Sequence, residues 1–198
     1  MKRPILGLAL CGGKSSRMGE DKAMLRIRPG LTQLEYAVQL LGCVCEEVAL
    51  GSGGAGARDR GLLAGLRRIQ DAQEVEGPMA SVLAALRAAE GRAVLALACD
   101  MPFLEARHLV QLVNRRDPAK RATAFVARDG SPEPMCAVYE SSCLPALEAA
   151  ARRGWASLRR FLAESDVELA RPDDPEFLAS VNDPDGLAAA RARFAKNS

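Results

Sequence analysis

The run Ala93–Cys99, which is almost wholly apolar, is the feature that most constrains the fold of this chain. A strand that is apolar at every position must be covered on both faces, which is typical of the centre of a parallel α/β sheet. A second short apolar run, Ile5–Leu10, ends at adjacent glycines and also reads as a buried strand. Because strand-like and helix-like segments alternate along the chain, the sequence predicts one α/β domain over residues 1–198, a three-layer, doubly wound, Rossmann-like and mostly parallel sheet.

The second half of the chain predicts a mixed edge to this sheet. Strands are expected at 122–127 and 135–139, joined by a hairpin or loop over 128–134 that contains Asp-Gly and two prolines. A short strand at 167–170 is expected at the edge. Further expectations are a strand at 47–50, a strand near Ile69, and helices at 31–43, 60–68, 79–89, 105–114, 143–152, 156–164 and 186–194. Asn182, together with Asp183 and Pro184, is expected to form the cap and the start of the last helix.

Composition excludes several classes of protein. The chain has 198 residues, 48% of them hydrophobic, which is enough for a full core. Its net charge of +2 is interspersed along the chain, so nucleic acid is not an expected partner. No apolar run approaches the ~20 residues of a membrane span, and the N-terminus lacks a signal-peptide cleavage site, so a cytoplasmic protein is expected. The six scattered cysteines lack zinc spacing and are expected to be reduced and buried, and the single histidine, His108, leaves no material for a Ser-His-Asp mechanism.

The loop after the first strand has the chemistry of a phosphate-binding site. Gly12 and Gly13 let backbone N–H groups approach an anion, because no Cβ intervenes. Lys14, Arg17 and Lys22 add positive charge, and the serines between them add hydroxyl groups. The spacing fits neither the Walker A motif nor the dinucleotide fingerprint. We interpret the loop as the seat of a nucleoside triphosphate.

Asp100 follows the apolar run directly, at the end of a strand that is expected to be central. An ionised carboxylate beside a buried strand is costly unless another group pairs with it. Ligands of open α/β sheets gather at the carboxyl ends of the strands, so Asp100 is well placed to hold a hard cation such as Mg²⁺.

Five segments, taken in chain order, resemble the motifs of the MobA-like nucleotidyltransferases, the family of the molybdenum cofactor guanylyltransferases. They are Leu10–Lys22, Gly77-Pro78, Ala98–Pro102, Pro134–Tyr139 and Ser180–Pro184. The resemblance implies a nucleotide-diphospho-sugar transferase-like fold and transfer of GMP from GTP to molybdopterin, with Mg²⁺ and release of pyrophosphate. It also implies contacts with other cofactor-biosynthesis proteins or with apo-molybdoenzymes.

The same resemblance implies roles for particular residues. The catalytic residues would be Arg17, Lys22 and Asp100, and Asp100 would also bind the metal. The nucleotide would be bound by Leu10, Cys11, Gly12, Gly13, Lys22, Asp71 and Asp100. Gly77 and Asn182 would lie at the substrates, and Gly19 matches a further motif position.

Three departures from the family pattern keep alternatives open. Cys11 stands in place of an alanine, Gly51-Ser-Gly in place of an asparagine-containing turn, and Ser180 in place of an asparagine. No physical argument from the sequence fixes the base. Cytidylyl transfer to the same pterin, nucleotidyl transfer to a sugar phosphate, and non-catalytic nucleotide binding are therefore the alternatives.

Overall fold

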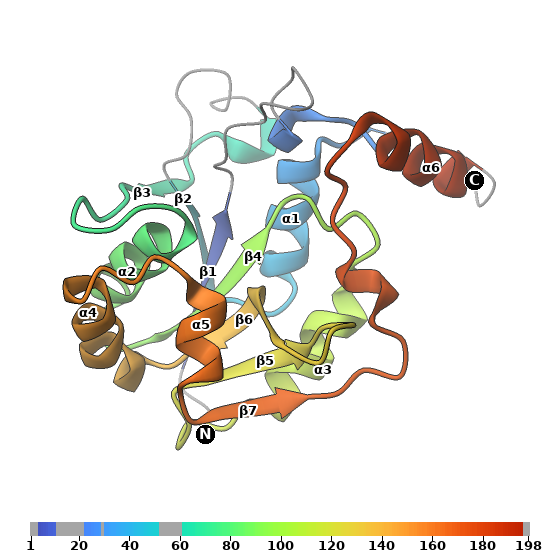
Figure 1. The fold of residues 1–198 in the computed structure, drawn as a ribbon. Coiled ribbons are helices and arrows are strands. Elements are labelled where there is room, and N and C mark those ends of the chain that lie inside the picture. The colour runs from blue at the N-terminus through green and yellow to red at the C-terminus, as the bar shows by residue number, and fades with distance from the viewer. Residues whose placement is uncertain (1–3, 11–21, 29, 52–60, 196–198) are drawn as a thin grey trace.

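The computed structural model describes residues 4–10, 22–28, 30–51 and 61–195. Within these residues seven strands form one sheet in the order β3-β2-β1-β4-β6-β5-β7 (Figure 1). The strands are β1 (Ile5–Leu10), β2 (Glu47–Gly51), β3 (Arg67–Ile69), β4 (Ala93–Ala98), β5 (Ala122–Val126), β6 (Pro132–Tyr139) and β7 (Val167–Ala170). β1 to β4 are parallel, whereas β6 runs antiparallel to both of its neighbours, β4 and β5. The expected mixed sheet is confirmed, with β7 at its edge.

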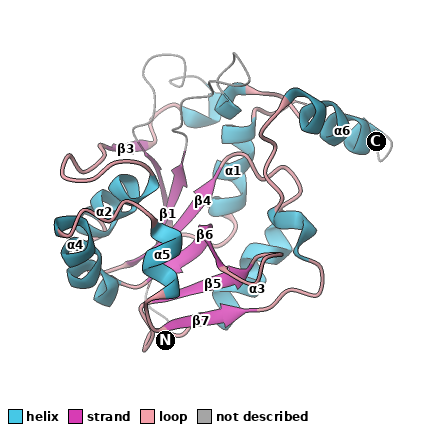
Figure 2. Cartoon of the chain, viewed as in Figure 1, coloured by secondary structure: helices cyan, strands magenta, loops and turns pink. Residues whose placement is uncertain are grey.

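Helices cover both faces of the sheet, which gives three layers (Figure 2). They are α1 (Gln33–Gly42), α2 (Pro78–Ala88), α3 (Ala106–Arg115), α4 (Leu144–Arg152), α5 (Leu158–Ala163) and α6 (Pro184–Ala195), with 3₁₀ turns η1 (Lys22–Met24), η2 (Gly61–Leu63), η3 (Ser141–Cys143) and η4 (Pro175–Leu178). Leu34 of α1 and Leu109 of α3 share one core cluster with Leu95 of β4. α2, α4 and α5 pack on the opposite face, where Leu8 of β1 lies.

The two apolar runs form neighbouring central strands. Every residue of β1 and of β4 is buried, as their composition predicts. Leu10 pairs with Ala98 in the parallel register, so the two strands end side by side. This alignment places whatever follows each strand at one edge of the sheet.

Two local expectations were wrong, and a third holds in part. The helix expected at 60–68 is in the described part only the turn η2, and β3 already begins at Arg67. β6 begins at Pro132, three residues earlier than expected, because proline is tolerated at the first residue of a strand and beside the register shift between Ala124 and Val126. Of the residues expected to cap and start the last helix, Asp183 accepts the hydrogen bond from the N–H group of Gly186 (2.8 Å) and α6 begins at Pro184, whereas Asn182 contacts Lys22 instead.

A buried ion pair joins the end of α3 to the end of β6. Arg116 Nε and Nη2 lie 2.6 and 2.8 Å from the two carboxylate oxygens of Glu140. Both side chains are almost wholly buried, with exposed fractions of 0% and 5%. The bidentate geometry is what allows two charges to lie inside this layer. None of the described helices is long and apolar enough to cross a membrane.

Candidate active site

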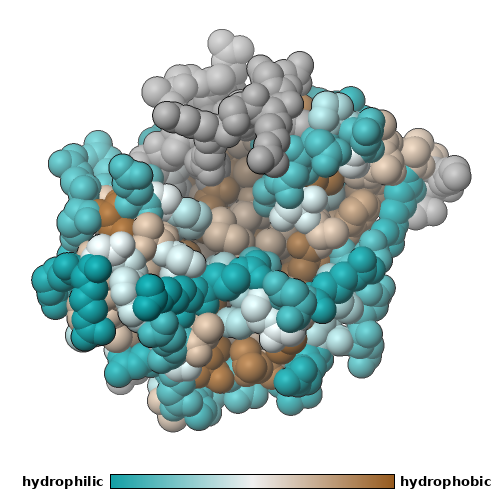
Figure 3. Space-filling model, viewed as in Figure 1, coloured by the Kyte–Doolittle hydropathy of each residue, from teal (hydrophilic) through white to brown (hydrophobic). Residues whose placement is uncertain are grey.

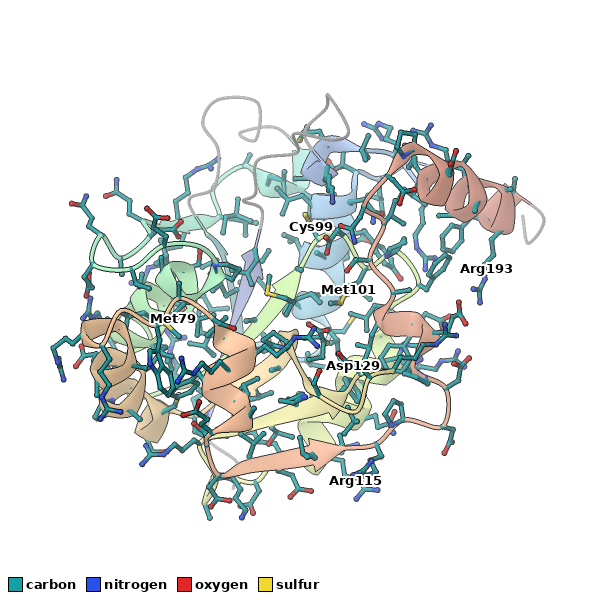
Figure 4. The ribbon with its side chains drawn as sticks, in the orientation of Figure 1. Met79, Cys99, Met101, Arg115, Asp129 and Arg193 are labelled. Atoms are coloured by element: carbon teal, nitrogen blue, oxygen red, sulfur yellow. The ribbon has the colours of Figure 1, made fainter. Side chains whose placement is uncertain are left out.

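The proposed site lies at the carboxyl edge of β1 and β4. The N–H group of Cys99 donates to the carbonyl oxygen of Leu10 (3.3 Å), so the β1–β4 pairing continues to the last residue before Asp100. Gln33, in the first turn of α1, donates through Nε2 to the carbonyl oxygen of Cys99 (3.2 Å). Figure 4 labels Cys99 and Met101, the two neighbours of Asp100, just beyond the end of β4. The backbone that carries Asp100 is therefore fixed from two directions.

Asp100 carries a charge that the fold only partly compensates. Burial raises the pKa of its carboxyl group, while the charge of Lys22 and a hydrogen bond from Ser180 act in the opposite direction. The N–H group of Val181 donates to the carbonyl oxygen of Asp100 (3.0 Å). The segment 180–181 thus contacts both the side chain and the backbone of this residue. A carboxylate whose burial outweighs its compensation is suited to bind a cation.

Lys22 lies near Asp100 and is hydrogen-bonded to a residue that is distant in the sequence. Its Nζ donates to Oδ1 of Asn182 at 2.7 Å, a hydrogen bond between residues 160 positions apart. Lys22 begins η1, and Asn182 follows directly on the segment that contacts Asp100. The tertiary fold therefore gathers a cation, a carboxylate and an amide from three distant parts of the sequence.

Asp71 and Gly77 lie on the other half of this edge, beyond β3. The hydroxyl group of Ser81, in α2, donates to Oδ1 of Asp71 at 2.6 Å. Gly77 precedes α2 with φ of 70° and ψ of −159°, a conformation that is essentially restricted to glycine. A Cβ on Gly51, the last residue of β2, would lie 3.5 Å from the Ser81 hydroxyl oxygen, so the ends of β2 and β3 meet here. The edge thus has two halves, one on β2–β3 and the other around Asp100.

The structure brings together some of the site residues that the sequence predicts. Leu10, Lys22, Asp100 and Asn182 come together as described, and Asp71 and Gly77 lie along the same edge. Cys11, Gly12, Gly13, Arg17 and Gly19 lie outside the described residues. The roles expected for all of these residues remain predictions.

Sequence reasoning missed two side chains at this edge, Ser81 and Glu133, and singled out Ser180 only as a departure from the family motif. Ser180 contacts Asp100, and Ser81, an ordinary serine in the sequence, contacts Asp71. Glu133 is buried in β6, and its charge interacts with that of Asp100. A glutamate in an otherwise apolar strand, between two prolines, is the one signal that could have drawn attention to it.

The oxygen ligands present fit a cation that takes few protein groups. No cluster of three or more His, Cys, Asp or Glu side chains that could hold a metal occurs among the residues with described positions. Mg²⁺ is commonly held by one or two carboxylates, with substrate phosphates and water completing its shell. A lone, partly compensated Asp100 suits this type of ion better than a zinc or calcium cage.

The cysteines and the histidine supply no catalytic group in the described region. Cys99, Cys136 and Cys143 are buried, as expected, but Cys43 is exposed because it follows the last residue of α1. His108 stacks on Phe177 with ring centroids 3.9 Å apart, and its Nδ1 accepts a hydrogen bond from the N–H group of Glu105. Burial also lowers the pKa of His108, which favours the neutral ring. Its role is to pack α3 against η4.

The strand order, with parallel central strands and an antiparallel β6, is that of the nucleotide-diphospho-sugar transferase fold. The model of the MobA-like NTP transferase domain matches residues 7–169, and the chain belongs to this family. The expectation drawn from the five motifs is confirmed.

Relatives of known annotation and structure agree with this assignment. The molybdenum cofactor guanylyltransferase of Cereibacter sphaeroides is 32% identical over 98% of this chain and 99% of its own length. The molybdenum cofactor biosynthesis bifunctional protein of Synechocystis is also 32% identical, over 92% of this chain, but the chain spans only about half (52%) of that protein. The structure of molybdopterin-guanine dinucleotide biosynthesis protein A from Archaeoglobus fulgidus superposes with a TM-score of 0.73 at 21% identity, covering 96% of this chain and 99% of the other.

Proposed function

We propose that this protein transfers GMP from GTP to molybdopterin, forming the guanine dinucleotide cofactor and releasing pyrophosphate. The observation that carries the proposal is the meeting of Lys22, Asp100 and Asn182 at the carboxyl edge of β1 and β4. It is supported by family membership and by the names of the full-length relatives. The proposed substrates are GTP and molybdopterin, and the proposed location is the cytoplasm.

The proposed chemistry needs no general base. A phosphate monoester has a second pKa near ~6, so the terminal phosphate of the acceptor is largely dianionic at neutral pH. One of its oxygens attacks the α-phosphorus of GTP, and the bond to the β-phosphate bridging oxygen breaks as pyrophosphate leaves. No proton has to be removed from the nucleophile, which agrees with the absence of a catalytic histidine from the described residues.

The task of the protein is to hold two anions against each other and to stabilise the charge that develops. Mg²⁺, held by Asp100, would neutralise phosphate charge when bound. Lys22 supplies a fixed positive charge next to the same carboxylate, and Asn182 holds its ammonium group. Arg17 and the Gly12-Gly13 backbone would add donors from the loop after β1. Leu10, Cys11 and Asp71 would line the nucleotide, and Gly77 and Asn182 would lie at the substrates.

The test is direct. Purified protein is incubated with Mg²⁺, GTP and molybdopterin, and both pyrophosphate release and activation of a guanine-dinucleotide-dependent apo-molybdoenzyme are measured. We expect both signals with GTP, neither with the Asp100→Ala variant, and little with CTP, UTP or ATP. Pyrophosphate release with CTP instead would assign the cytidylyl branch. Tight GTP binding without pyrophosphate release on any acceptor would leave a non-catalytic nucleotide-binding protein.

A further inference from the structure

A cavity opens near the proposed active site, on the half of the edge away from β2 and β3. It has a volume of about 280 Å³ and is lined by Ala127, Arg128, Asp129, Glu133, Arg159, Pro175, Glu176, Leu178 and Ala179. These residues come from the end of β5, the start of β6, α5 and the segment around η4. Ala179 directly precedes Ser180, which hydrogen-bonds to Asp100, so one continuous segment of backbone forms a wall of both sites. Figure 4 labels Asp129 on the loop between β5 and β6, below Met101 in this view.

Glu133 is the most buried ionisable group in the wall of this cavity. The residue is only 7% exposed. One carboxylate oxygen accepts a hydrogen bond from the N–H group of Met135 (2.8 Å), and the other lies 3.7 Å from Nη2 of Arg159, too far for a hydrogen bond. Burial raises the pKa of Glu133, and the charge of Asp100 raises it further. Several lone pairs of a buried carboxylate are thus left for a ligand.

The cations of the cavity are largely committed to other partners. Arg159 Nη1 contacts the carboxylate of Asp129 at 3.0 Å and also donates to the Ser131 hydroxyl group. Arg128 pairs with Glu176 at 2.9 Å. These pairs are exposed at the rim and define the mouth of the cavity, and Arg159, whose Nη2 lies 3.7 Å from the Glu133 carboxylate, compensates the charge of that group only in part. Figure 3 shows this face hollowed at its centre, with paler and brown residues above a hydrophilic band.

The size and lining of the cavity select a flat ring with polar N–H groups at one edge. Drug-sized ligands occupy pockets of roughly 300–1,000 Å³, so about 280 Å³ suits a fused bicyclic ring but not a whole dinucleotide. Ala127, Pro175 and Leu178 offer apolar surface to its faces. A carboxylate at the inner end accepts two parallel hydrogen bonds from neighbouring N–H groups, as it does from a guanidinium fork.

We propose that Glu133 reads the 2-amino-pyrimidinone edge of the acceptor's pterin ring, and that the cavity around it holds that ring while the acceptor phosphate lies at Asp100. The inference rests on the proposed transfer to molybdopterin and names the residue that selects the acceptor. Guanine carries the same edge, but Asp71, which is expected to contact the nucleotide, lies on the opposite half, beyond β3. The ring is therefore assigned to the acceptor, and the experiment separates the two sources.

Two fluorescent probes test this without any transfer reaction. They are 6-hydroxymethylpterin and 6-hydroxymethyllumazine, in which an oxo group replaces the 2-amino group and would face the carboxylate with an acceptor. We expect the wild-type protein to bind the pterin at least about tenfold more tightly, since hydrogen bonds to a charged group are worth at least this factor. Glu133→Gln should bring the two affinities to within about twofold of each other. Glu164→Gln, the same change at an exposed position outside the cavity, should keep the wild-type ratio.

Further measurements separate recognition from structure. GTP affinity should be unchanged in Glu133→Gln, and, where transfer is measured, the KM for molybdopterin should rise about tenfold while the KM for GTP stays constant. Ala179→Leu narrows the cavity from an exposed position and leaves the Glu133 carboxylate in place, so it should lower the affinity for both probes by the same factor. This variant replaces Glu133→Gln as the test of the cavity if Glu133→Gln does not fold.

Two results would overturn the assignment: a wild-type protein with no preference for the pterin, or a Glu133→Gln variant that keeps it. Loss of GTP binding in that variant would assign the edge to guanine instead. Absence of pyrophosphate release together with a normal probe preference would count against the transfer reaction alone.

Discussion

The hydrogen bond between Lys22 and Asn182 predicts a measurable coupling between two ends of the chain. Removing a donor aimed at developing negative charge typically costs about 2.7–4 kcal/mol, so Lys22→Ala should lower kcat by roughly 10²–10³-fold. The Lys22–Asn182 bond is short, 2.7 Å, and has a charged donor, but it is exposed. We therefore assign it about 1 kcal/mol, or roughly a fivefold change in rate. Asn182→Ala alone should lower kcat/KM by about this factor.

A double-mutant cycle measures the coupling energy between Lys22 and Asn182. If Asn182 acts by holding Lys22, then Asn182→Ala should have almost no further effect once Lys22 is alanine, which gives a coupling energy of about 1 kcal/mol. The assay is initial-rate pyrophosphate release at saturating and limiting acceptor. Asp183→Asn, which keeps an acceptor for the N–H group of Gly186, is the neighbouring control and should behave as wild type. Strictly additive effects would refute the reasoning and show that Asn182 contacts a substrate independently of Lys22.

Two further predictions concern the scaffold. Glu140→Gln removes the negative charge that faces the buried guanidinium of Arg116, so it should lower the free energy of unfolding by about 3–5 kcal/mol in urea titrations. The control is Glu164→Gln, in the exposed i,i+4 pair with Arg160, which should change the free energy of unfolding by no more than about 0.5 kcal/mol. Equal losses of stability in the two variants would contradict the inference that burial makes the Arg116–Glu140 pair the more important one. Gly77→Ala should cost about 1–3 kcal/mol because φ is 70° there, although its Cβ would meet no atom within 4 Å. Gly42→Ala, at the last residue of α1, should be neutral or stabilising in the same thermal-unfolding assay, and a harmless Gly77→Ala would exclude backbone strain.

Local composition was sufficient to predict most of the architecture. Ala93–Cys99 and Ile5–Leu10 are apolar at nearly every position, and only a strand covered on both faces buries every residue of such a run. Errors fell where local signals compete: Pro132 reads as loop in sequence but is accommodated beside a register shift in β6. The helix expected at 60–68 failed because its pattern was too short to decide between a helix and a strand.

The candidate site divides in the same way. Asp100 could be singled out because it directly follows a buried strand, and the segment from Gly12 to Lys22 because it combines glycines with cations. No sequence pattern could show that Asn182 binds Lys22 or that Ser180 contacts Asp100, since these contacts span about 80 to 160 residues. In the sequence, Glu133 falls in a predicted loop that contains two prolines. In the structure it is a buried residue of β6, and its charge interacts with that of Asp100.

The physical reason is that hydrophobic periodicity is a local property, which each segment carries in its own residues. Local sequence was therefore sufficient for most strands and helices, for the prediction of a phosphate-binding loop and for the acidic residue after β4. Which side chains share the edge is decided by strand order and register, because parallel strands from distant segments all end there. Only the tertiary structure could place Glu133 beside that edge and show a cavity around it.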